Sequence, residues 1–307
     1  MMGMHGSYWA NHAASNADVI IALGMRMDDR ALGRFADMNP RARIVHVDID
    51  PAEHGKNIPT HVPIVGDVKV VLRQLQDAVE TNSHAEWVRW IDDLRAEHGH
   101  SMAVPSGPEI SVQYVCDRIS ALNSDEVVIV TGVGQHQMWA AQFLAIDGPR
   151  RWLTSGGLGT MGFGVPAAIG AQQAFPDSYV VNFDGDGCFQ MTMQELATAR
   201  CYDVPAIHAV MNNGWLGMVR QWQELFHDER FSETNLFGTI PDFVKLAEAY
   251  GCLALRAETE AEVDAVVAEA IAARRPTVID FRIDHEEKVY PMVPAGAASH
   301  EMLDEAW

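Results

Sequence analysis

Two short polar motifs follow neighbouring strand-like segments of this sequence. Asp186 lies in the run 183–187, and Asn213 ends the run 209–213, 27 positions further along. The apolar runs 178–183 and 205–211 indicate buried parallel strands, with a helix at 190–200 between them. Such a crossover brings the carboxyl ends of two parallel strands to one edge of a sheet. We therefore expect the Asp186 carboxylate and the Asn213 amide oxygen to converge there.

A pair of oxygen ligands at this edge suits Mg²⁺, which prefers hard oxygen donors. Gly185 and Gly187 allow the backbone to approach a ligand closely, and a helix start favours an anion. The motif pair therefore predicts a divalent cation that clamps a diphosphate. The simpler alternative is that both motifs are ordinary turns closing two strands, but their spacing at successive strand ends favours the cation site.

Composition excludes several classes of partner. A length of 307 residues leaves room for two domains, and 48% hydrophobic with 21% charged residues is typical of a globular cytosolic protein. The net charge of −20 disfavours binding to nucleic acid or to anionic membranes. We see no apolar segment of membrane-spanning length and no signal-peptide pattern, and the four scattered cysteines suggest neither a zinc site nor a disulfide framework. We therefore expect a cytoplasmic protein.

The predicted elements fall into two α/β regions. Residues 1–98 contain a buried strand at 18–24, a strand at 43–48, and helices at 67–80 and 85–98. Turn formers at 99–108 indicate a linker. In 109–307 we predict helices at 109–122, 136–145, 163–175, 190–200, 216–227, 241–250 and 259–273, and strands at 126–131, 151–154, 178–184, 205–212, 252–256 and 277–283. This alternation predicts a doubly wound parallel sheet.

Two further glycine-rich turns follow predicted strands. The turn 157–162 formally matches G-x-G-x-x-G, which leaves a nicotinamide-dependent oxidoreductase as an alternative. However, the next strand ends in glycines that suit a phosphate better than a ribose. The turn 131–137 contains Gly134, Gln135 and His136 and also starts a helix. Three glycine-containing turns thus follow strands of one predicted sheet, and together they imply a single ligand. Taken alone, His136 could equally be an ordinary helix-start residue.

Together these motifs resemble the thiamine-diphosphate enzymes and, more narrowly, the large catalytic subunit of acetolactate synthase. The resemblance covers nearly the whole chain. It rests on the segments 4–6, 24–30, 47–51, 132–142, 154–162, 217–222 and 290–296. It implies the thiamine-diphosphate-binding fold for 109–307, preceded in 1–98 by part of a Rossmann-like, FAD-binding middle domain.

The resemblance also implies roles for individual residues. Mg²⁺ would be bound by Asp186, Asn213 and the backbone carbonyl of Trp215. Met161 would bend the cofactor. Thiamine diphosphate would contact Gly134, Gln135, His136, Gly159, Met161, Gly185, Asp186, Gly187, Cys188, Asn213 and Met218. FAD would contact Met4, His5, Gly24, Arg26, Asp28, Arg30, Asp48, Ile49, Asp67 and Val68.

Simpler interpretations stay open for some of these residues. Met218 and Trp222, implied to lie on an active-site helix, are four positions apart and could pack in an ordinary core. The charged residues of segment 26–30 could form a solvated loop. Asp48 could hold a ribose hydroxyl or cap a turn.

The implied reaction decarboxylates pyruvate and transfers the two-carbon unit to a second 2-keto acid, in the biosynthesis of branched-chain amino acids. Trp222 would favour 2-ketobutyrate over pyruvate as acceptor, a graded preference because one methylene is worth only about 1–3 kcal/mol. The glutamate that activates the cofactor lies in the family's N-terminal domain, so we expect this chain to need a partner chain supplying it. Oligomerisation and a regulatory small subunit are further expectations.

Two other interpretations remain. The chain could be a non-catalytic fragment that binds thiamine diphosphate and Mg²⁺. It could also be another member of the superfamily, such as a keto-acid decarboxylase, which releases acetaldehyde, or a pyruvate oxidase, which forms acetyl phosphate.

Overall fold

The computed structural model describes residues 1–99, 110–122, 126–146 and 148–303. The chain divides into two compact units, which we call unit 1 (Met1–Met102 and Tyr290–Trp307) and unit 2 (Ala103–Val289). The expected linker at 99–108 lies, apart from Gly99, outside the described residues.

The last segment of the chain groups with unit 1, whereas the sequence had placed it in a domain spanning 109–307. Backbone hydrogen bonds explain this assignment. The amide of Val293 donates to the carbonyl of Met4 at 2.7 Å, and the amide of Arg34 donates to the carbonyl of Ala297 at 2.8 Å.

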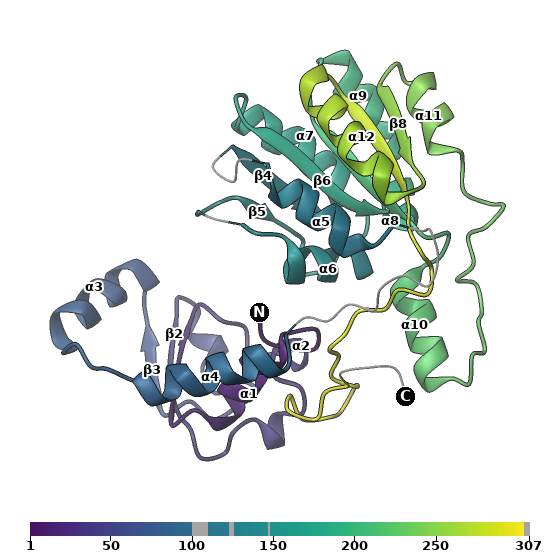
Figure 1. Ribbon diagram of the computed structural model, residues 1–307. Coiled ribbons are helices and arrows are strands. Elements are labelled where there is room, and N and C mark those ends of the chain that lie inside the picture. Colours follow the sequence, from purple (N-terminus) through teal and green to yellow (C-terminus); the bar gives the residue numbers. More distant parts are fainter. Residues whose placement is uncertain (100–109, 123–125, 147, 304–307) are drawn as a thin grey trace. The chain divides into compact units, whose positions relative to one another are not determined.

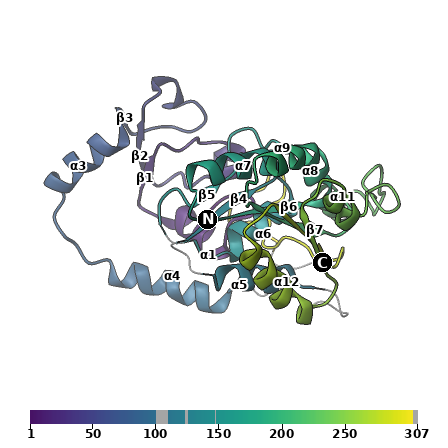
Figure 2. The same cartoon turned by 90° about the horizontal axis from the view of Figure 1, so that it is seen from above.

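Unit 1 contains a three-stranded parallel sheet in the order β1-β2-β3. Its strands are β1 (Val19–Leu23), β2 (Arg43–Asp48) and β3 (Val62–Val65), and its helices are α1 (Tyr8–Asn16), α2 (Asp29–Leu32), α3 (Val68–Ala78) and α4 (Ala85–Glu97). Short 3₁₀ helices cover Phe35–Asp37 and Pro51–Glu53. Figure 2 shows the chain leaving α3 through an extended segment to reach α4. α4 lies beside α1, where the Arg95 guanidinium stands 5.7 Å from the ring centre of Trp9.

β1 is not the buried strand that the sequence predicts. Val19, Ile21 and Leu23 are 53%, 56% and 40% exposed, whereas Ala22 is buried. Alternate residues of a strand point to opposite faces of the sheet. Only the face bearing Ala22 packs on the core of unit 1, which contains Leu32 and Ile44.

Unit 2 is built on a six-stranded parallel sheet in the order β5-β4-β6-β7-β9-β8. The strands are β4 (Val127–Thr131), β5 (Trp152–Leu153), β6 (Tyr179–Gly185), β7 (Ile207–Asn212), β8 (Leu253–Ala257) and β9 (Thr277–Arg282). β4 and β7 are buried along their whole length and β6 along all but its first residue, as expected for parallel strands covered on both faces.

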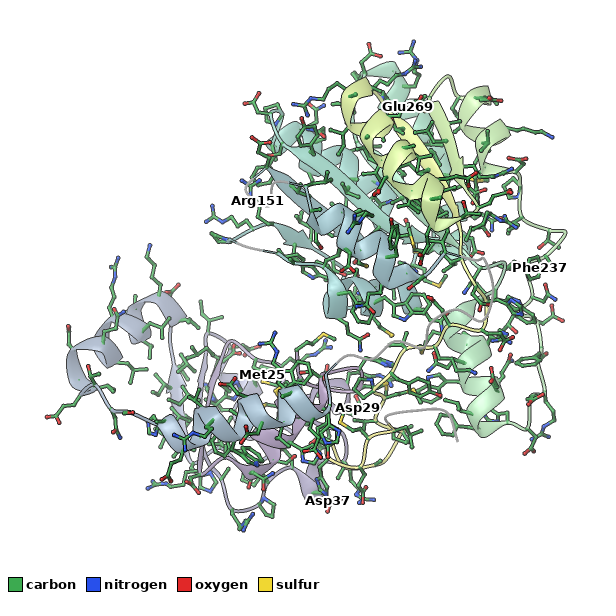
Figure 3. The ribbon with its side chains drawn as sticks, in the orientation of Figure 1. Met25, Asp29, Asp37, Arg151, Phe237 and Glu269 are labelled. Carbon is green, nitrogen blue, oxygen red and sulfur yellow. The ribbon has the colours of Figure 1, made fainter. Side chains whose placement is uncertain are left out.

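Helices cover both faces of this sheet, which confirms the doubly wound prediction (Figure 1). One face carries α5 (Val112–Ser120), α6 (Gln135–Phe143) and α12 (Glu260–Ala273). The other carries α7 (Gly164–Ala174), α9 (Leu196–Cys201) and α11 (Phe243–Ala249). α10 spans Gly217–Phe226. Immediately before β5, Arg151, labelled in Figure 3, donates to the Ser178 hydroxyl at 3.1 Å.

The helix expected at 190–200 is interrupted in the structure. It consists of α8 (Asp186–Gln190), a 3₁₀ turn (Met193–Glu195) and α9. The break falls at Thr192, whose hydroxyl donates to the carbonyl of Gly162 at 2.8 Å. The interruption therefore ties this region to the loop that carries Met161.

Within the described residues, no helix is both long enough and apolar enough to cross a bilayer.

Candidate cofactor and metal site

The polar motifs meet at the carboxyl ends of β4, β6 and β7. β4 and β6 are neighbours in the sheet, while β5 lies on the far side of β4, so the connections change direction between β4 and β6. Such a switch point is where open α/β sheets bind ligands. A cavity of about 90 Å³ opens at this place. Its lining includes Gly134, Gln135, His136, Met161, Gly185, Asp186, Gly187, Cys188, Asn213, Trp215 and Met218.

Gly159 and Trp222 are not among the residues that line this cavity. Gly159 has a φ of +63° and its amide donates to the carbonyl of Ser155 at 2.9 Å, so it closes a turn. Trp222 is partly buried on α10 and packs edge-on against Phe226, with ring centres 5.5 Å apart. Phe226 is itself 40% exposed, so this contact does not place Trp222 in a buried core, and the role of Trp222 stays a prediction.

Asp186 begins α8 immediately after β6 and is 2% exposed. Its carboxylate accepts hydrogen bonds from the amides of Gly187 at 2.7 Å and Gly214 at 2.6 Å. Burial raises the pKa of Asp186 to about 7, although these two amides lower it. The charge of Arg282 also lowers this pKa, but both donors given above for the carboxylate are neutral amides, and a divalent cation would hold it ionised.

Asn213 lies close to the Asp186 carboxylate, because the residue after it, Gly214, donates its amide to that carboxylate. Its side-chain oxygen accepts from the amide of Trp215 at 3.0 Å, and its side-chain nitrogen donates to Gln135 at 3.3 Å. A carboxylate oxygen and an amide oxygen form a donor set that suits Mg²⁺. The residues present therefore fit the cation that the sequence predicts.

The indole of Trp215 is held by surrounding side chains. Phe237, labelled in Figure 3, packs edge-on against it with ring centres 6.4 Å apart. The guanidinium of Arg220, which is on α10, lies 5.0 Å from the centre of the indole. These contacts fix the segment whose backbone carbonyl is expected to reach the cation.

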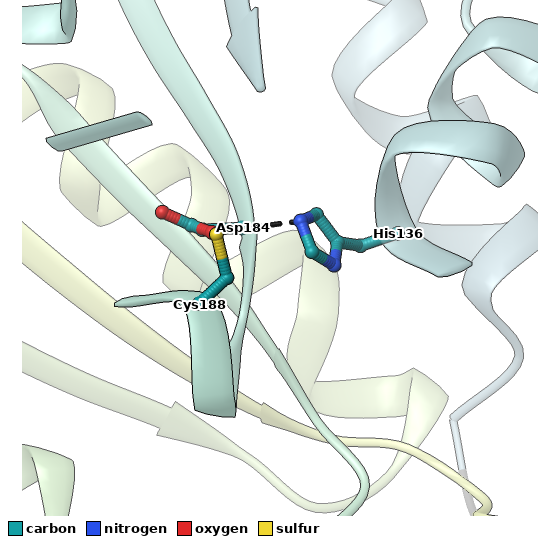
Figure 4. Close-up of side chains that lie close together, drawn as sticks. All are labelled: His136, Asp184 and Cys188. Atoms are coloured by element: carbon teal, nitrogen blue, oxygen red, sulfur yellow. Dashed lines mark ion pairs between the residues drawn. The ribbon is translucent and has the colours of Figure 1, made fainter. Parts of the chain in front are cut away.

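His136, Asp184 and Cys188 form a buried cluster (Figure 4), and two of its members, His136 and Cys188, also line the cavity. The His136 Nε2 lies 3.5 Å from an Asp184 carboxylate oxygen. Burial lowers the pKa of His136 to about 3 and raises that of Asp184 to about 6, so the imidazole is uncharged at neutral pH and the contact is not an ion pair.

One potential ligand atom from each member of this cluster lies within 4.8 Å of the others. However, the Cys188 sulfur already accepts from the amides of Gly162 at 3.1 Å and Val133 at 3.3 Å. Burial also raises the pKa of the thiol. The sulfur of Cys188, on α8, is thus tied to the backbone at Val133 and at Gly162.

The amides of the two glycines that flank Asp186 donate within the protein. The amide of Gly187 donates to Asp186, and that of Gly185 donates to Asp184 at 3.0 Å. A Cβ at Gly185 would lie 2.5 Å from the His136 ring, so this glycine is needed for close packing.

Sequence reasoning missed three buried polar residues that contact the lining of the cavity. Asp184 and Gln221 do so through their side chains, which contact His136 and Gln135, and Glu287 through its backbone carbonyl, which accepts from Gln135. Asp184, Gln221 and Glu287 are 0%, 1% and 7% exposed. Gln221 could have been noticed, because a polar residue stands between Met218 and Trp222 in a segment already singled out. Glu287 offers no such signal, since its partner Val112 is 175 positions away.

Unit 1 contains an open hollow of about 760 Å³ at the carboxyl ends of its strands. Its lining combines five residues expected to contact FAD, namely Gly24, Asp48, Ile49, Asp67 and Val68, with Gly66, Lys69, Leu72, Arg73 and Gln76. Asp67 also caps α3 by accepting from the amide of Lys69 at 2.8 Å. Asp48 accepts from the amide of Asp50 at 2.9 Å, as the turn-capping alternative requires.

The other five expected FAD residues do not line this hollow. Arg26 donates to Asp28 at 2.6 Å, and Asp28 caps α2. Arg30 accepts at its carbonyl from the amide of Met4 at 2.8 Å. His5 is 6% exposed, and burial together with the charge of Arg30 lowers its pKa to about 4. These residues form a separate group near the N-terminus of the chain.

Comparison with known proteins agrees with both units. Residues 132–281 match the thiamine pyrophosphate enzyme C-terminal TPP binding domain, and residues 1–75 match the central domain of the same enzymes.

Relatives match almost the whole chain. It is 48% identical to acetolactate synthase of Mycobacterium leprae and 45% identical to the acetolactate synthase large subunit of Corynebacterium glutamicum, in each case over 98% of this chain and 50% of the relative. It is 42% identical to acetolactate synthase 1, chloroplastic, of Oryza sativa subsp. japonica, over 99% of this chain and 49% of the relative. The chain thus spans about half the length of these relatives. It belongs to the thiamine pyrophosphate enzymes, as a homologue of the acetolactate synthases that carries the family's central and TPP-binding domains.

Proposed function

We propose that this chain provides the thiamine-diphosphate and Mg²⁺ site of an acetolactate synthase. The reaction would decarboxylate pyruvate and join the two-carbon unit to a second 2-keto acid, either pyruvate or 2-ketobutyrate. The observation that carries this proposal is the cavity at the switch point of unit 2, where Asp186, Asn213 and Trp215 lie together with Met161 and Met218.

In this proposal, the chain's own residues bind and orient the cofactor. Asp186, Asn213 and the carbonyl of Trp215 would hold Mg²⁺, and the 134–136 turn would lie against the diphosphate. Met161 and Met218 would press on the cofactor from its apolar side and keep water out of the reacting region. When bound, thiamine diphosphate supplies an acidic carbon and an electron sink for the charge left by decarboxylation.

Calorimetric titration with thiamine diphosphate, with and without Mg²⁺, tests the proposal. Binding should require the cation, and Asp186→Ala should weaken it by at least about tenfold, since loss of supporting contacts alone typically costs 10–100-fold in metal sites. Asp264→Ala is the matched control, because that carboxylate on α12 is 62% exposed and is not among the residues that line the cavity. Unchanged cofactor affinity in Asp186→Ala would refute the proposal.

Product analysis separates the related activities. Acetolactate from pyruvate supports the proposed reaction, whereas acetaldehyde or acetyl phosphate would assign the chain to a decarboxylase or an oxidase. Binding is the primary readout, because the chain spans about half the length of its relatives and the activating glutamate is expected from the family's N-terminal domain.

We further propose that FAD binds along the hollow of unit 1. Support comes from the glycine-lined strand ends at Gly24 and Gly66 and from Lys69 and Arg73, which could neutralise its phosphates. Flavin absorbance in the purified protein tests this assignment.

We also propose homo-oligomers, and a regulatory small subunit as partner, because a relative is named the large subunit. We propose a reducing cytoplasm as the location of this chain, because the four cysteines are scattered along the sequence without a pairing pattern.

A further inference from the structure

A row of buried amide side chains runs from the proposed cation site to the end of unit 2. The side-chain nitrogen of Asn213 donates to the Gln135 oxygen at 3.3 Å, and the Gln135 nitrogen donates to the Gln221 oxygen at 2.9 Å. Gln221 then pairs with the backbone of Val289 in both directions. We call these four residues the amide relay. Its members are 0–7% exposed.

The backbone of Val289 sets the orientation of every amide in this relay. A side-chain amide can be turned so that its oxygen and nitrogen exchange places, but a peptide group cannot. The Val289 amide donates to the Gln221 oxygen at 2.9 Å, and the Gln221 nitrogen donates to the Val289 carbonyl at 3.0 Å. Turning Gln221 would therefore oppose donor to donor and acceptor to acceptor.

The same constraint passes to the next two residues. With its oxygen fixed, Gln221 accepts from Gln135, which must present its nitrogen there and its oxygen towards Asn213. The carbonyl of Glu287 also accepts from the Gln135 nitrogen at 3.4 Å and supports this orientation. Asn213 must then turn its nitrogen to Gln135, which leaves its oxygen on the side of the Trp215 amide.

Gly217 gives an independent sign that the relay is tightly fitted. A Cβ at this position would overlap the Gln135 oxygen and lie 2.9 Å from the Asn213 side-chain nitrogen. Its φ is not positive, so backbone conformation does not require glycine here. The requirement comes from the two amides packed against its Cα.

We propose that Gln221 is a positioning residue, which acts through Gln135 to present the oxygen of Asn213, rather than its nitrogen, to the bound cation. This inference rests on the proposed function for the identity of the ligand. A cation is attracted by an amide oxygen and repelled by an amide NH₂ group, so the orientation of Asn213 matters directly to its affinity.

The first test replaces Gln221 by methionine, which has a similar volume and no amide. Mn²⁺ titration in the presence of thiamine diphosphate should show about three- to tenfold weaker cation binding, the worth of a buried hydrogen bond or two. Gln172→Met is the matched control. Gln172 is 2% exposed on α7, and its nitrogen donates to the carbonyls of Phe175 and Ser178 at 2.9 and 3.0 Å. That variant should lose stability but keep the parent's cation affinity.

A second readout needs no ligand. The Trp215 backbone amide donates to the Asn213 oxygen, so its hydrogen exchange reports the orientation of Asn213. We expect exchange at Trp215 to become several-fold faster in Gln221→Met and in Gly217→Ala, but not in Gln172→Met.

The two proposals can fail separately. A parent protein that binds neither thiamine diphosphate nor Mn²⁺ would refute the proposed function, while the exchange data would still test the relay. Unaltered Trp215 exchange in Gln221→Met, or equal loss of cation affinity in Gln172→Met, would overturn the role of Gln221.

Discussion

Glu287 is a buried carboxyl group that faces Val112, the first residue of α5, and makes the stability of unit 2 depend on pH. Its two oxygens lie 3.2 and 3.4 Å from the amide of Val112, and the residue is 7% exposed. Burial raises its pKa from 4.5 to about 8; the Val112 amide opposes this, while the charge of Asp284 adds to it. The folded protein therefore holds this proton more tightly than the unfolded chain does.

The sign of the effect follows from linkage. A carboxyl group with a raised folded-state pKa contributes its full stabilisation below pH 4.5, and this contribution is lost as the pH rises through about 8. At about 1.4 kcal/mol per pKa unit, this rise in the pKa of Glu287 corresponds to a loss of up to about 5 kcal/mol in the free energy of unfolding at high pH. This is a large share of the stability of an ordinary domain, typically about 5–15 kcal/mol.

Urea unfolding of the parent and of Glu287→Gln at pH 5 and pH 8.5 measures this loss. Glutamine keeps an acceptor for the Val112 amide but does not titrate, and other groups titrate alike in both proteins. The free energy of unfolding of the variant should rise relative to the parent by several kcal/mol between the two pH values.

Glu262→Gln is the control for this experiment. Amides of Glu258 and Thr259 lower the pKa of Glu262, so its contribution is lost only as the pH falls below about 4.5, outside the measured range. The control should lose its capping box equally at both pH values. If parent and Glu287→Gln give parallel curves from pH 5 to 8.5, the burial argument for Glu287 is wrong.

Two further substitutions test packing in unit 2, each read by chemical denaturation. In α7, Gly164→Ala should destabilise the protein by several kcal/mol, because the added Cβ would overlap the Asn182 oxygen and lie 2.6 Å from an Asp184 oxygen. Gly170→Ala in the same helix is the control: its Cβ would meet no atom within 4 Å, so it should stabilise the protein by about 0.5–1 kcal/mol. Equal effects at the two glycines would contradict the model of close approach. Phe243→Ala should lower the free energy of unfolding by about 3–5 kcal/mol, since Phe243 is fully buried and its ring is edge-on to Phe189 at 5.4 Å. A loss below about 1 kcal/mol would show that neighbouring side chains move into the space left by the ring.

The sequence predicted elements best where the apolar pattern is unambiguous. The strand expected at 43–48 agrees with β2, and those at 126–131 and 205–212 agree with β4 and β7 within two residues. β3 was missed, because a four-residue run containing Pro63 resembles a loop. The break at Thr192 was missed as well, since it depends on a hydrogen bond to a loop 30 positions away.

In the candidate site, too, local patterns could be predicted from the sequence, whereas contacts between distant segments could not. Spacing and strand direction sufficed to place Asp186 and Asn213 at one edge, because parallel connectivity leaves few alternatives. The supporting polar residues could not be found this way. Gln221 meets Val289 across 68 positions, and only the folded chain brings these groups together. The domain boundary near residue 290 likewise depends on contacts with the first residues of the chain.

The exposed row on β1 has a practical consequence for anyone handling this protein. Val19, Ile21 and Leu23 face solvent on β1, which is an edge strand of the three-stranded sheet. Within the described residues, no strand pairs with the outer edge of β1. An apolar row beside free peptide groups is the template on which a second molecule can add a strand. In concentrated solution, self-association would begin at this strand, and a single lysine in place of Ile21 would be the smallest change to discourage it.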